Sequence, residues 1–237
     1  MENIVYKTLL NNMQIDIKKH RFISISGTNK CGKTTLIKIL SGIIHTDIKL
    51  PGKNIGVIFN RQDNFIHSTV DKTIDYYSES IEDVIKLKII KYLSLTKLLK
   101  KNIHKLTPFE KLRLNIAIEL LKKNNLLLID DIGTYFTKKE KEELFSILKR
   151  LVEEDIKIIY TTSNLDYTIY SEYLYILDNG KIVLEGKPLL VLKEDTSLNK
   201  LGLDLPFMID FSIKLIDYNI IENIELDLDR MVDTIWN

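Results

Sequence analysis

One motif constrains the fold of this chain more than any other. Residues 27–34 read Gly-Thr-Asn-Lys-Cys-Gly-Lys-Thr and match the phosphate-binding pattern G-x-x-x-x-G-K-[ST]. The β-branched run Phe22–Ile25 precedes the motif as a predicted strand, and apolar residues at helical spacing follow it over Thr34–Leu40. A strand, a glycine loop and a helix in this order predict an α/β fold with a nucleotide-binding loop.

Each residue type in this loop has a physical task on a bound nucleoside triphosphate. Glycines let successive backbone N–H groups point toward the phosphates, and the start of the helix adds partial positive charge. Lys33 is expected to reach the β- and γ-phosphates, and the Thr34 hydroxyl to bind Mg²⁺. The predicted nucleotide-binding residues of the loop are Gly27, Thr28, Asn29, Lys30, Cys31, Gly32, Lys33, Thr34 and Thr35.

An apolar strand that ends in two carboxylates supplies the second nucleotide signal. Residues 126–131 read Leu-Leu-Leu-Ile-Asp-Asp, and the aspartate at the end of such a strand holds Mg²⁺ in phosphate-loop hydrolases. Asp130 is therefore predicted to share the Mg²⁺ ion with Thr34. Taken alone, a strand ending in acidic residues is as often an ordinary solvated terminus, but the phosphate loop upstream favours the functional interpretation.

Short apolar runs and helical segments alternate along the rest of the chain. Buried parallel strands are predicted at Ile55–Phe59, Leu126–Ile129 and Ile156–Tyr160. The pattern is helical from Phe65 to Asn124, and its clearest helical segments are Ile81–Tyr92 and Lys111–Lys122. Asp178-Asn179-Gly180 predicts a hairpin turn, and the sequence changes character at Gly186-Lys187-Pro188. We expect a nucleotide-binding domain over residues 1–187 with a helical subdomain inserted at about 65–123, and a C-terminal extension over 188–237. The extension is too short to form a sizeable core of its own, so it should pack on the main domain or on a partner.

Composition narrows the class of partner and the compartment. The 237 residues carry 34 Lys and Arg against 33 Asp and Glu, a net charge of +1, so no basic field indicates nucleic acid as a partner. No apolar run approaches the roughly 20 residues of a membrane-spanning helix, and the N-terminus lacks the apolar core of a signal peptide. The single cysteine, Cys31, cannot form an internal disulfide. We expect a protein of the cytosol that can dock on a membrane protein.

Further motifs follow in the order of one family. Residues 57–64 (Val-Ile-Phe-Asn-Arg-Gln-Asp-Asn) resemble its Q-loop, and residues 106–113 (Leu-Thr-Pro-Phe-Glu-Lys-Leu-Arg) stand at its signature motif. Residues 179–188 resemble the hairpin after its switch loop, and residues 201–207 (Leu-Gly-Leu-Asp-Leu-Pro-Phe) resemble a C-terminal segment of one branch. The chain thus resembles ATP-binding cassette (ABC) ATPases with a phosphate-loop fold, and most closely the ATPase subunits of energy-coupling factor (ECF) transporters.

The resemblance implies how such a chain works. It implies ATP and Mg²⁺ as ligands, and a pair of ATPase subunits in which each ATP lies between one phosphate loop and the other chain's signature helix. It also implies a membrane scaffold subunit and a membrane subunit that captures a vitamin or transition-metal ion, with the ATPase on the cytoplasmic face. Tyr6 is similar in position to the aromatic that stacks on adenine, although an ordinary half-buried strand tyrosine is an equal alternative.

Several residues depart from the family at positions that act in hydrolysis. The position of the expected catalytic glutamate holds Asp131, whose side chain is one methylene shorter and therefore reaches less far toward an attacking water. The switch histidine is Ser163, which brings no cationic form. The Q-loop glutamine, expected near the Mg²⁺, aligns with Asn60, but a shift of register would supply Gln62 instead.

The signature motif is altered as well. A serine and two glycines are expected where Thr107, Pro108 and Phe109 stand, so Thr107 keeps a hydroxyl, whereas Phe109 adds bulk and Glu110 adds charge beside the partner's phosphate. Thr107-Pro108-x-Glu110 is also a capping box, which can be all that the motif still does. The aspartate expected in the following loop is Thr137, and the stretch from Gly42 to Gly56 is short for the family's β-subdomain.

Two functions follow as hypotheses. The first is an ATP-binding and ATP-hydrolysing subunit of an ECF importer, paired with a less divergent sister ATPase, in which Asp131, Ser163 and Asn60 act in catalysis. The second is a regulatory pseudo-ATPase that binds ATP and braces the heterodimer while the partner hydrolyses.

Overall fold

The computed structural model describes residues 2–6, 10–45, 54–59, 65–133 and 135–236. Its centre is a six-stranded sheet with the order β4-β5-β6-β3-β7-β8, in which the β7–β8 pair is antiparallel and the other pairs are parallel. A separate antiparallel pair joins β1 and β2. The strands are β1 (Glu2–Tyr6), β2 (Leu10–Ile15), β3 (Phe22–Gly27), β4 (Ile55–Phe59), β5 (Leu126–Asp130), β6 (Lys157–Thr161), β7 (Tyr173–Asp178) and β8 (Lys181–Gly186).

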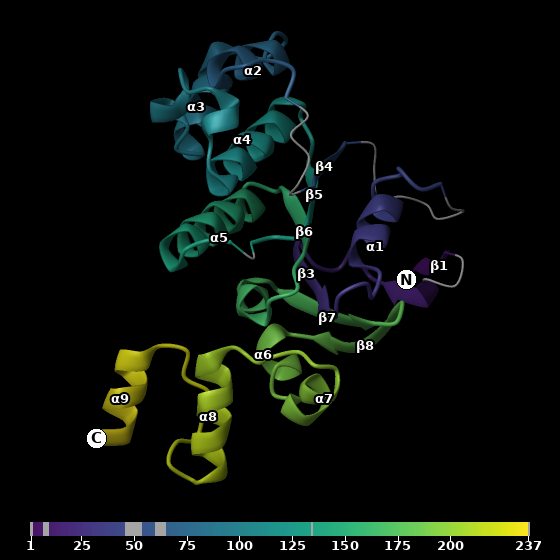
Figure 1. Ribbon diagram of the computed structural model, residues 1–237, viewed down its shortest axis with the longest axis vertical. Coiled ribbons are helices and arrows are strands. Elements are labelled where there is room, and N and C mark those ends of the chain that lie inside the picture. The colour runs from purple at the N-terminus through teal and green to yellow at the C-terminus, as the bar shows by residue number, and fades with distance from the viewer. Residues whose placement is uncertain (1, 7–9, 46–53, 60–64, 134, 237) are drawn as a thin grey trace.

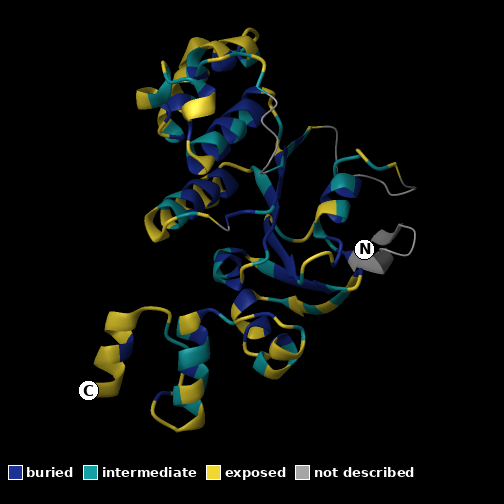
Figure 2. Ribbon diagram, viewed as in Figure 1, coloured by how far each residue is buried: buried dark blue, intermediate teal, exposed yellow. Residues whose placement is uncertain are grey.

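The central strands are apolar on both faces because helices cover both faces (Figure 1). Ile23 and Ile25 of β3 pack with Leu36 and other apolar residues of α1 (Lys33–Leu40). The strand residues that alternate with these, such as Phe22, lie on the opposite face and join the cluster that contains Leu144 of α5 (Lys138–Glu153). This alternation places α1 and α5 on opposite faces and makes the sheet the buried middle layer of the molecule (Figure 2).

The segment between β4 and β5 is a helical lobe at one end of the molecule (Figure 1). It consists of α2 (Val70–Tyr77), α3 (Asp83–Tyr92), two short 3-10 turns at Thr96–Leu98 and Ile103–Lys105, and α4 (Pro108–Leu121). α4 packs on β4 as well as on α2 and α3, so it joins the lobe to the sheet.

The C-terminal helices lie at the opposite end of the molecule (Figure 1). They are α6 (Pro188–Val191), α7 (Asp195–Lys200), α8 (Phe207–Asp217) and α9 (Leu228–Trp236). Apolar residues of this segment form one buried cluster with residues of β7 and of the 3-10 helix Leu165–Tyr170: Leu165, Leu174, Ile176, Val191, Leu192, Leu198, Leu203 and Ile209. The extension therefore packs on the nucleotide-binding part; the domain boundaries given above remain predictions.

Most predicted elements are confirmed, with ends displaced by a few residues. β4 has the predicted bounds, β5 ends one residue later than predicted, and β6 begins and ends one residue later than predicted. α4 begins at Pro108 rather than Lys111, because the capping box at Thr107 starts the helix there. The predicted turn at Asp178–Gly180 joins β7 to β8.

Candidate functional site

The phosphate loop leaves the carboxyl end of β3 and opens directly into α1. Gly27 has a φ of 148°, and a Cβ atom there would lie 2.0 Å from the Leu177 carbonyl oxygen of the neighbouring strand β7. Gly32, at the helix N-cap, has a φ of 111°. Both positions therefore need glycine, the first for close approach of two strands and the second for its backbone conformation.

Lys33 folds back over the loop that precedes it. Its Nζ donates hydrogen bonds to the carbonyl oxygens of Gly27, at 2.7 Å, and Thr28, at 2.9 Å. The ammonium group thus lies at the mouth of the loop. A bound phosphate would replace these carbonyl oxygens as the acceptor of its hydrogen bonds. Asn29, Lys30 and Thr34 are exposed, which leaves this side of the loop open to a ligand.

The turn between β7 and β8 supports the loop from behind. The Thr28 hydroxyl donates to Asp178 Oδ1 at 3.3 Å, and the Gly180 N–H donates to the Cys31 carbonyl oxygen at 3.1 Å. The turn is predictable from its Asp-Asn-Gly sequence, but its contact with the phosphate loop is not, because nearly 150 residues separate the two segments along the chain. Parallel pairing of β3 with β7 brings them together.

Cys31 is a packing residue of the loop. Its side chain is 3% exposed and joins the apolar cluster under α1. Burial raises the pKa of the thiol, although the Lys33 ammonium partly opposes this effect. A protonated, buried thiol is a poor nucleophile, so we assign Cys31 no chemical role.

The two carboxylates follow β5, two strands away from the phosphate loop. Asp130 is buried at 7% exposure, and its Oδ1 accepts a hydrogen bond of 2.8 Å from the Thr161 hydroxyl. The same hydroxyl oxygen accepts a hydrogen bond of 2.8 Å from the Asp131 N–H. Asp131 is half-buried with a left-handed φ of 59°, so the chain turns immediately after the strand. Because β5 and β3 are parallel within one sheet, both carboxylates lie at the same edge as the loop.

The chemistry of these residues fits Mg²⁺. The Thr34 hydroxyl and the Asp130 carboxylate are oxygen ligands, which Mg²⁺ prefers. None of the ion pairs among the described residues involves Asp130, so no lysine or arginine in that part of the chain is paired with its carboxylate. A buried carboxylate whose hydrogen-bond donor is a neutral hydroxyl is suited to a cation.

Of the other predicted catalytic residues, the structure describes Ser163. Ser163 is half-buried and lies two residues after Thr161, the last residue of β6. Because the Thr161 hydroxyl contacts Asp130, this places Ser163 at the same end of the sheet as the carboxylates. Phe59, the last residue of β4, is paired in register with Asp130. Asn60 and Gln62 lie outside the described residues. Tyr6 ends β1, and its side chain is also outside what the structure describes.

The signature-position residues form the predicted capping box. Thr107 Oγ1 accepts from the Glu110 N–H at 3.2 Å, and Glu110 Oε2 accepts from the Thr107 N–H at 2.9 Å. Lys101 Nζ also lies 2.7 Å from Glu110 Oε2. Burial opposes charge on Glu110, but the hydrogen bonds from Lys101 and the Thr107 N–H outweigh it and hold the pKa of this carboxyl below its usual range. The charge expected to face a partner's phosphate is thus paired within the chain.

Phe109 requires a correction. The sequence predicted a bulky ring on the surface that faces the partner, but Phe109 is 4% exposed. Its ring packs edge-on against Phe136 at 5.5 Å, and the Arg113 guanidinium lies 4.6 Å above it. The prediction failed because the capping box fixes the phase of α4 and turns this position inward. Thr137 caps α5 through a second capping box, with Glu140.

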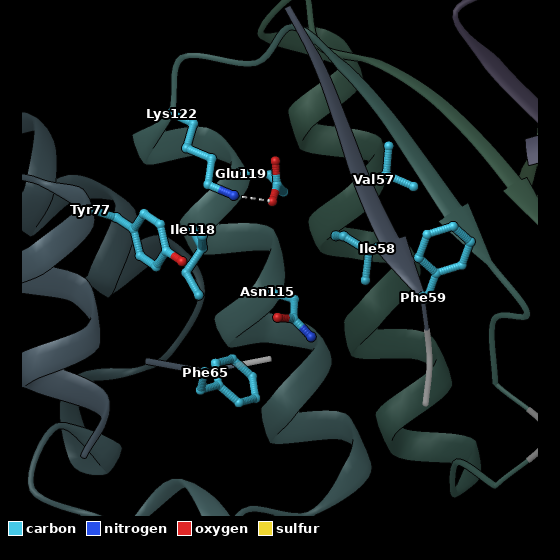
Figure 3. Close-up of a pocket in the computed structure, with 9 residues that line it drawn as sticks. All are labelled: Val57, Ile58, Phe59, Phe65, Tyr77, Asn115, Ile118, Glu119 and Lys122. Atoms are coloured by element: carbon cyan, nitrogen blue, oxygen red, sulfur yellow. Dashed lines mark hydrogen bonds and ion pairs between the residues drawn. The ribbon is translucent and has the colours of Figure 1, made fainter. Parts of the chain in front are cut away.

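A cavity of about 220 Å³ opens where the helical lobe meets the sheet (Figure 3). Its walls come from the end of β4, from α2 and from α4, and Phe65 closes one side. Glu119 accepts hydrogen bonds from Lys122 at 2.8 Å and Asn124 at 2.7 Å, which fixes its carboxylate beside the cavity. Sequence analysis did not identify this cavity. The lining residues are Val57, Ile58, Phe59, Phe65, Tyr77, Asn115, Ile118, Glu119 and Lys122.

Comparison with known families decides the class. The model of the ABC transporter family matches residues 10–133, slightly more than half of the chain, and includes the phosphate loop, the signature position and both carboxylates. The chain belongs to the ABC transporter ATPase family. Nucleotide-binding domains of this family bind ATP, and the predicted recognition and fold class are confirmed.

Individual relatives of this ABC ATPase agree. It is 25% identical to "Energy-coupling factor transporter ATP-binding protein EcfA1" of Mycoplasmoides gallisepticum over 97% of this chain and 90% of the relative. It is 26% identical to EcfA of Pediococcus pentosaceus over 94% of this chain and 88% of the relative. Its fold matches cbiO1 of Clostridium perfringens, described as part of the ABC transporter complex cbiONQ, with a TM-score of 0.71 and 23% identity over 89% and 95% of the two chains.

Proposed function

We propose that this chain is the ATP-hydrolysing subunit of an ECF-type importer that powers uptake of a vitamin or a transition-metal ion. The observation that carries the proposal is the sheet edge at which Lys33, at the mouth of its loop, and the buried Asp130 both lie. The names of the curated relatives support the ECF branch. Specificity for the transported molecule would reside in a separate membrane subunit.

The residues at this edge have distinct tasks in the proposed reaction. The loop amides and Lys33 bind the β- and γ-phosphates, and Thr34 and Asp130 hold the Mg²⁺. Bound Mg²⁺ neutralises charge on the phosphate oxygens during transfer. Asp131 accepts a hydrogen bond from the attacking water and orients it toward the γ-phosphate. Ser163 donates a hydrogen bond to the γ-phosphate, and Asn60 or Gln62 completes the Mg²⁺ surroundings.

The proposed assembly contains three kinds of partner. A second ABC ATPase would complete the ATP site, and a scaffold subunit and a substrate-binding subunit would lie in the membrane, with this chain peripheral on the cytoplasmic face. No helix among the described residues has the length and apolar character needed to cross a membrane. The cavity between β4 and the helical lobe supports docking, because the polar groups of Asn115, Glu119 and Lys122 beside its apolar residues suit an inserted side chain of a membrane subunit.

We propose a heterodimer rather than a homodimer. Thr107 caps its own helix, Phe109 is buried, and Glu110 is paired with Lys101, so this signature offers little to a partner's phosphate. A homodimer would carry this defect at both ATP sites, whereas a sister subunit with serine and glycines would restore one. Native mass spectrometry of the active complex should show one copy of this chain. Two copies without a sister ATPase would contradict the proposal.

A regulatory pseudo-ATPase is the second candidate function. Two residues of this chain's own ATP site favour it: the shorter carboxylate of Asp131, and Ser163 at the position of the switch histidine. In this function the chain binds ATP at an intact phosphate loop and stabilises the closed dimer while the sister subunit's site hydrolyses.

Substitution of the candidate base separates the two functions. Asp131→Asn preserves the shape of the side chain but removes the carboxylate, so it should lower ATP turnover of the intact complex about 100-fold if this chain hydrolyses ATP. The measurement is steady-state phosphate release by the purified complex, with the partner unchanged and ATP binding monitored in parallel. Turnover that stays at the wild-type level with normal ATP binding would reject hydrolysis by this chain in favour of the regulatory function.

A further inference from the structure

Thr161 connects both carboxylates of the candidate site through one oxygen atom. The hydroxyl donates to Asp130 Oδ1 at 2.8 Å and accepts from the Asp131 N–H at 2.8 Å. The backbone carbonyl of Thr161 accepts from the Ile132 N–H at 2.7 Å. Three consecutive residues at the end of β5 are therefore fixed by a single residue of β6.

The position of Thr161 in the sheet makes this arrangement rigid. The residue is 0% exposed and pairs in register with Ile25 of β3, two residues before the phosphate loop. The next residue, Thr162, donates its N–H to the Ile25 carbonyl oxygen at 3.1 Å. β6 lies between β5 and β3, so Thr161 connects the strand of the carboxylates to the strand of the phosphate loop.

We infer that Thr161 is a positioning residue for Mg²⁺, acting through Asp130 and Asp131; the inference rests on the proposed function. A donor to one oxygen of Asp130 fixes the rotation of the carboxylate and leaves its other oxygen to face the ion. An acceptor for the Asp131 N–H fixes the left-handed turn, with its φ of 59°, which sets the direction of the shorter side chain. Valine has nearly the same shape but can do neither.

The same contacts extend to the switch position. The Thr162 hydroxyl donates to the Ile132 carbonyl oxygen at 3.1 Å and accepts from the Asn164 N–H at 3.2 Å. Ser163 is held between these two residues, so the segment that would meet the γ-phosphate is attached to the segment that would hold the Mg²⁺. Displacement of the segment that carries Asp130 should therefore also displace the segment that carries Ser163.

Nucleotide binding by the full-length chain tests the inference without requiring hydrolysis. The dissociation constant of a fluorescent ATP analogue is measured in EDTA and in excess Mg²⁺ for wild type, Thr161→Ser and Thr161→Ala. The two variants both lack the methyl group and differ by the hydroxyl oxygen alone. The affinity gained on adding Mg²⁺ should be near wild type for serine and about tenfold smaller for alanine, with binding in EDTA unchanged in both.

Two further variants exclude a general loss of stability. Thr161→Val removes the hydroxyl but keeps the volume, and it should match alanine. Thr73→Val makes the same change at another fully buried threonine, in α2 of the helical lobe, and should keep the wild-type gain. An equal Mg²⁺ gain in wild type and Thr161→Ala, or an equal loss in Thr161→Ser and Thr161→Ala, would overturn the inference. A wild-type chain that binds no ATP would instead overturn the proposed function.

Discussion

At the scale of single residues, Asp131 is one methylene shorter than the family's glutamate and adopts a left-handed backbone conformation. Its φ of 59° lies in the left-handed region, which aspartate and asparagine tolerate better than glutamate does. The Thr161 hydroxyl holds the N–H in this conformation. The shorter carboxylate and the turn therefore belong together, and replacing one alone should not restore the family's geometry.

Stability measurements test this coupling. Asp131→Glu should lower the free energy of unfolding by about 1 kcal/mol, because the longer side chain disfavours the left-handed turn. Asp131→Asn should leave it nearly unchanged. Urea unfolding of both variants gives the comparison, and a glutamate variant as stable as wild type would contradict the role assigned to the turn.

The residue scale also shows what the sequence could predict. The phosphate loop was predictable because its glycines, Lys33 and Thr34 are contiguous. Thr161 was not, because its contact with Asp130 spans 31 residues and depends on β6 lying beside β5. Asp131 was recognised by its place after the strand, but its left-handed φ has no sequence signal beyond the tolerance of aspartate for it.

At the scale of elements, the residues at the start of α4 form a helix cap and an ion pair within this chain. The capping box was predictable from Thr107-Pro108-x-Glu110, whereas the ion pair with Lys101 was not, because that lysine lies outside the pattern. The inward turn of Phe109 follows from the phase that the cap imposes on the helix. The capping box at the predicted signature position is thus confirmed, whereas the exposure of Phe109 was predicted incorrectly.

The Glu110 pair predicts an acid-dependent contribution to stability. The pKa of Glu110 in the folded chain lies below its ordinary 4.5, so its charge stabilises the fold above that value and the contribution is lost as pH falls through the folded pKa. The difference in free energy of unfolding between wild type and Glu110→Gln should therefore be largest above pH about 5 and shrink below it. Glu79→Gln, on the exposed surface of the same lobe, is the control. A difference that stays constant with pH would contradict the assignment.

At the scale of the whole molecule, the C-terminal extension is part of the packed structure. Leu192 is fully buried in the cluster that includes Leu174 and Ile176 of β7. Sequence analysis predicted that the extension would pack on the main domain or on a partner, and the structure shows packing on β7. The sequence could not decide between the main domain and a partner. The apolar patterns of the segments that meet here are each too short to predict that they contact one another.

Two leucines that are two positions apart in the sequence test this packing. Leu192→Ala should lower the free energy of unfolding by about 2–5 kcal/mol, because it leaves a cavity between the extension and the sheet. Leu190→Ala, at a residue that is 61% exposed, should change it by less than about 0.5 kcal/mol. Urea unfolding followed by circular dichroism distinguishes them. Equal effects would show that the extension does not contribute to the core.

The central claim is that the phosphate loop of this chain takes part in ATP turnover. The direct test is steady-state ATP hydrolysis by the complex purified from its membrane, with Lys33→Ala in this chain and the partner unchanged. Removal of the ammonium group that the structure places at the mouth of the loop should lower the rate about 100-fold without disassembly. An unchanged rate from an intact complex would contradict the claim and leave this chain a structural or regulatory half.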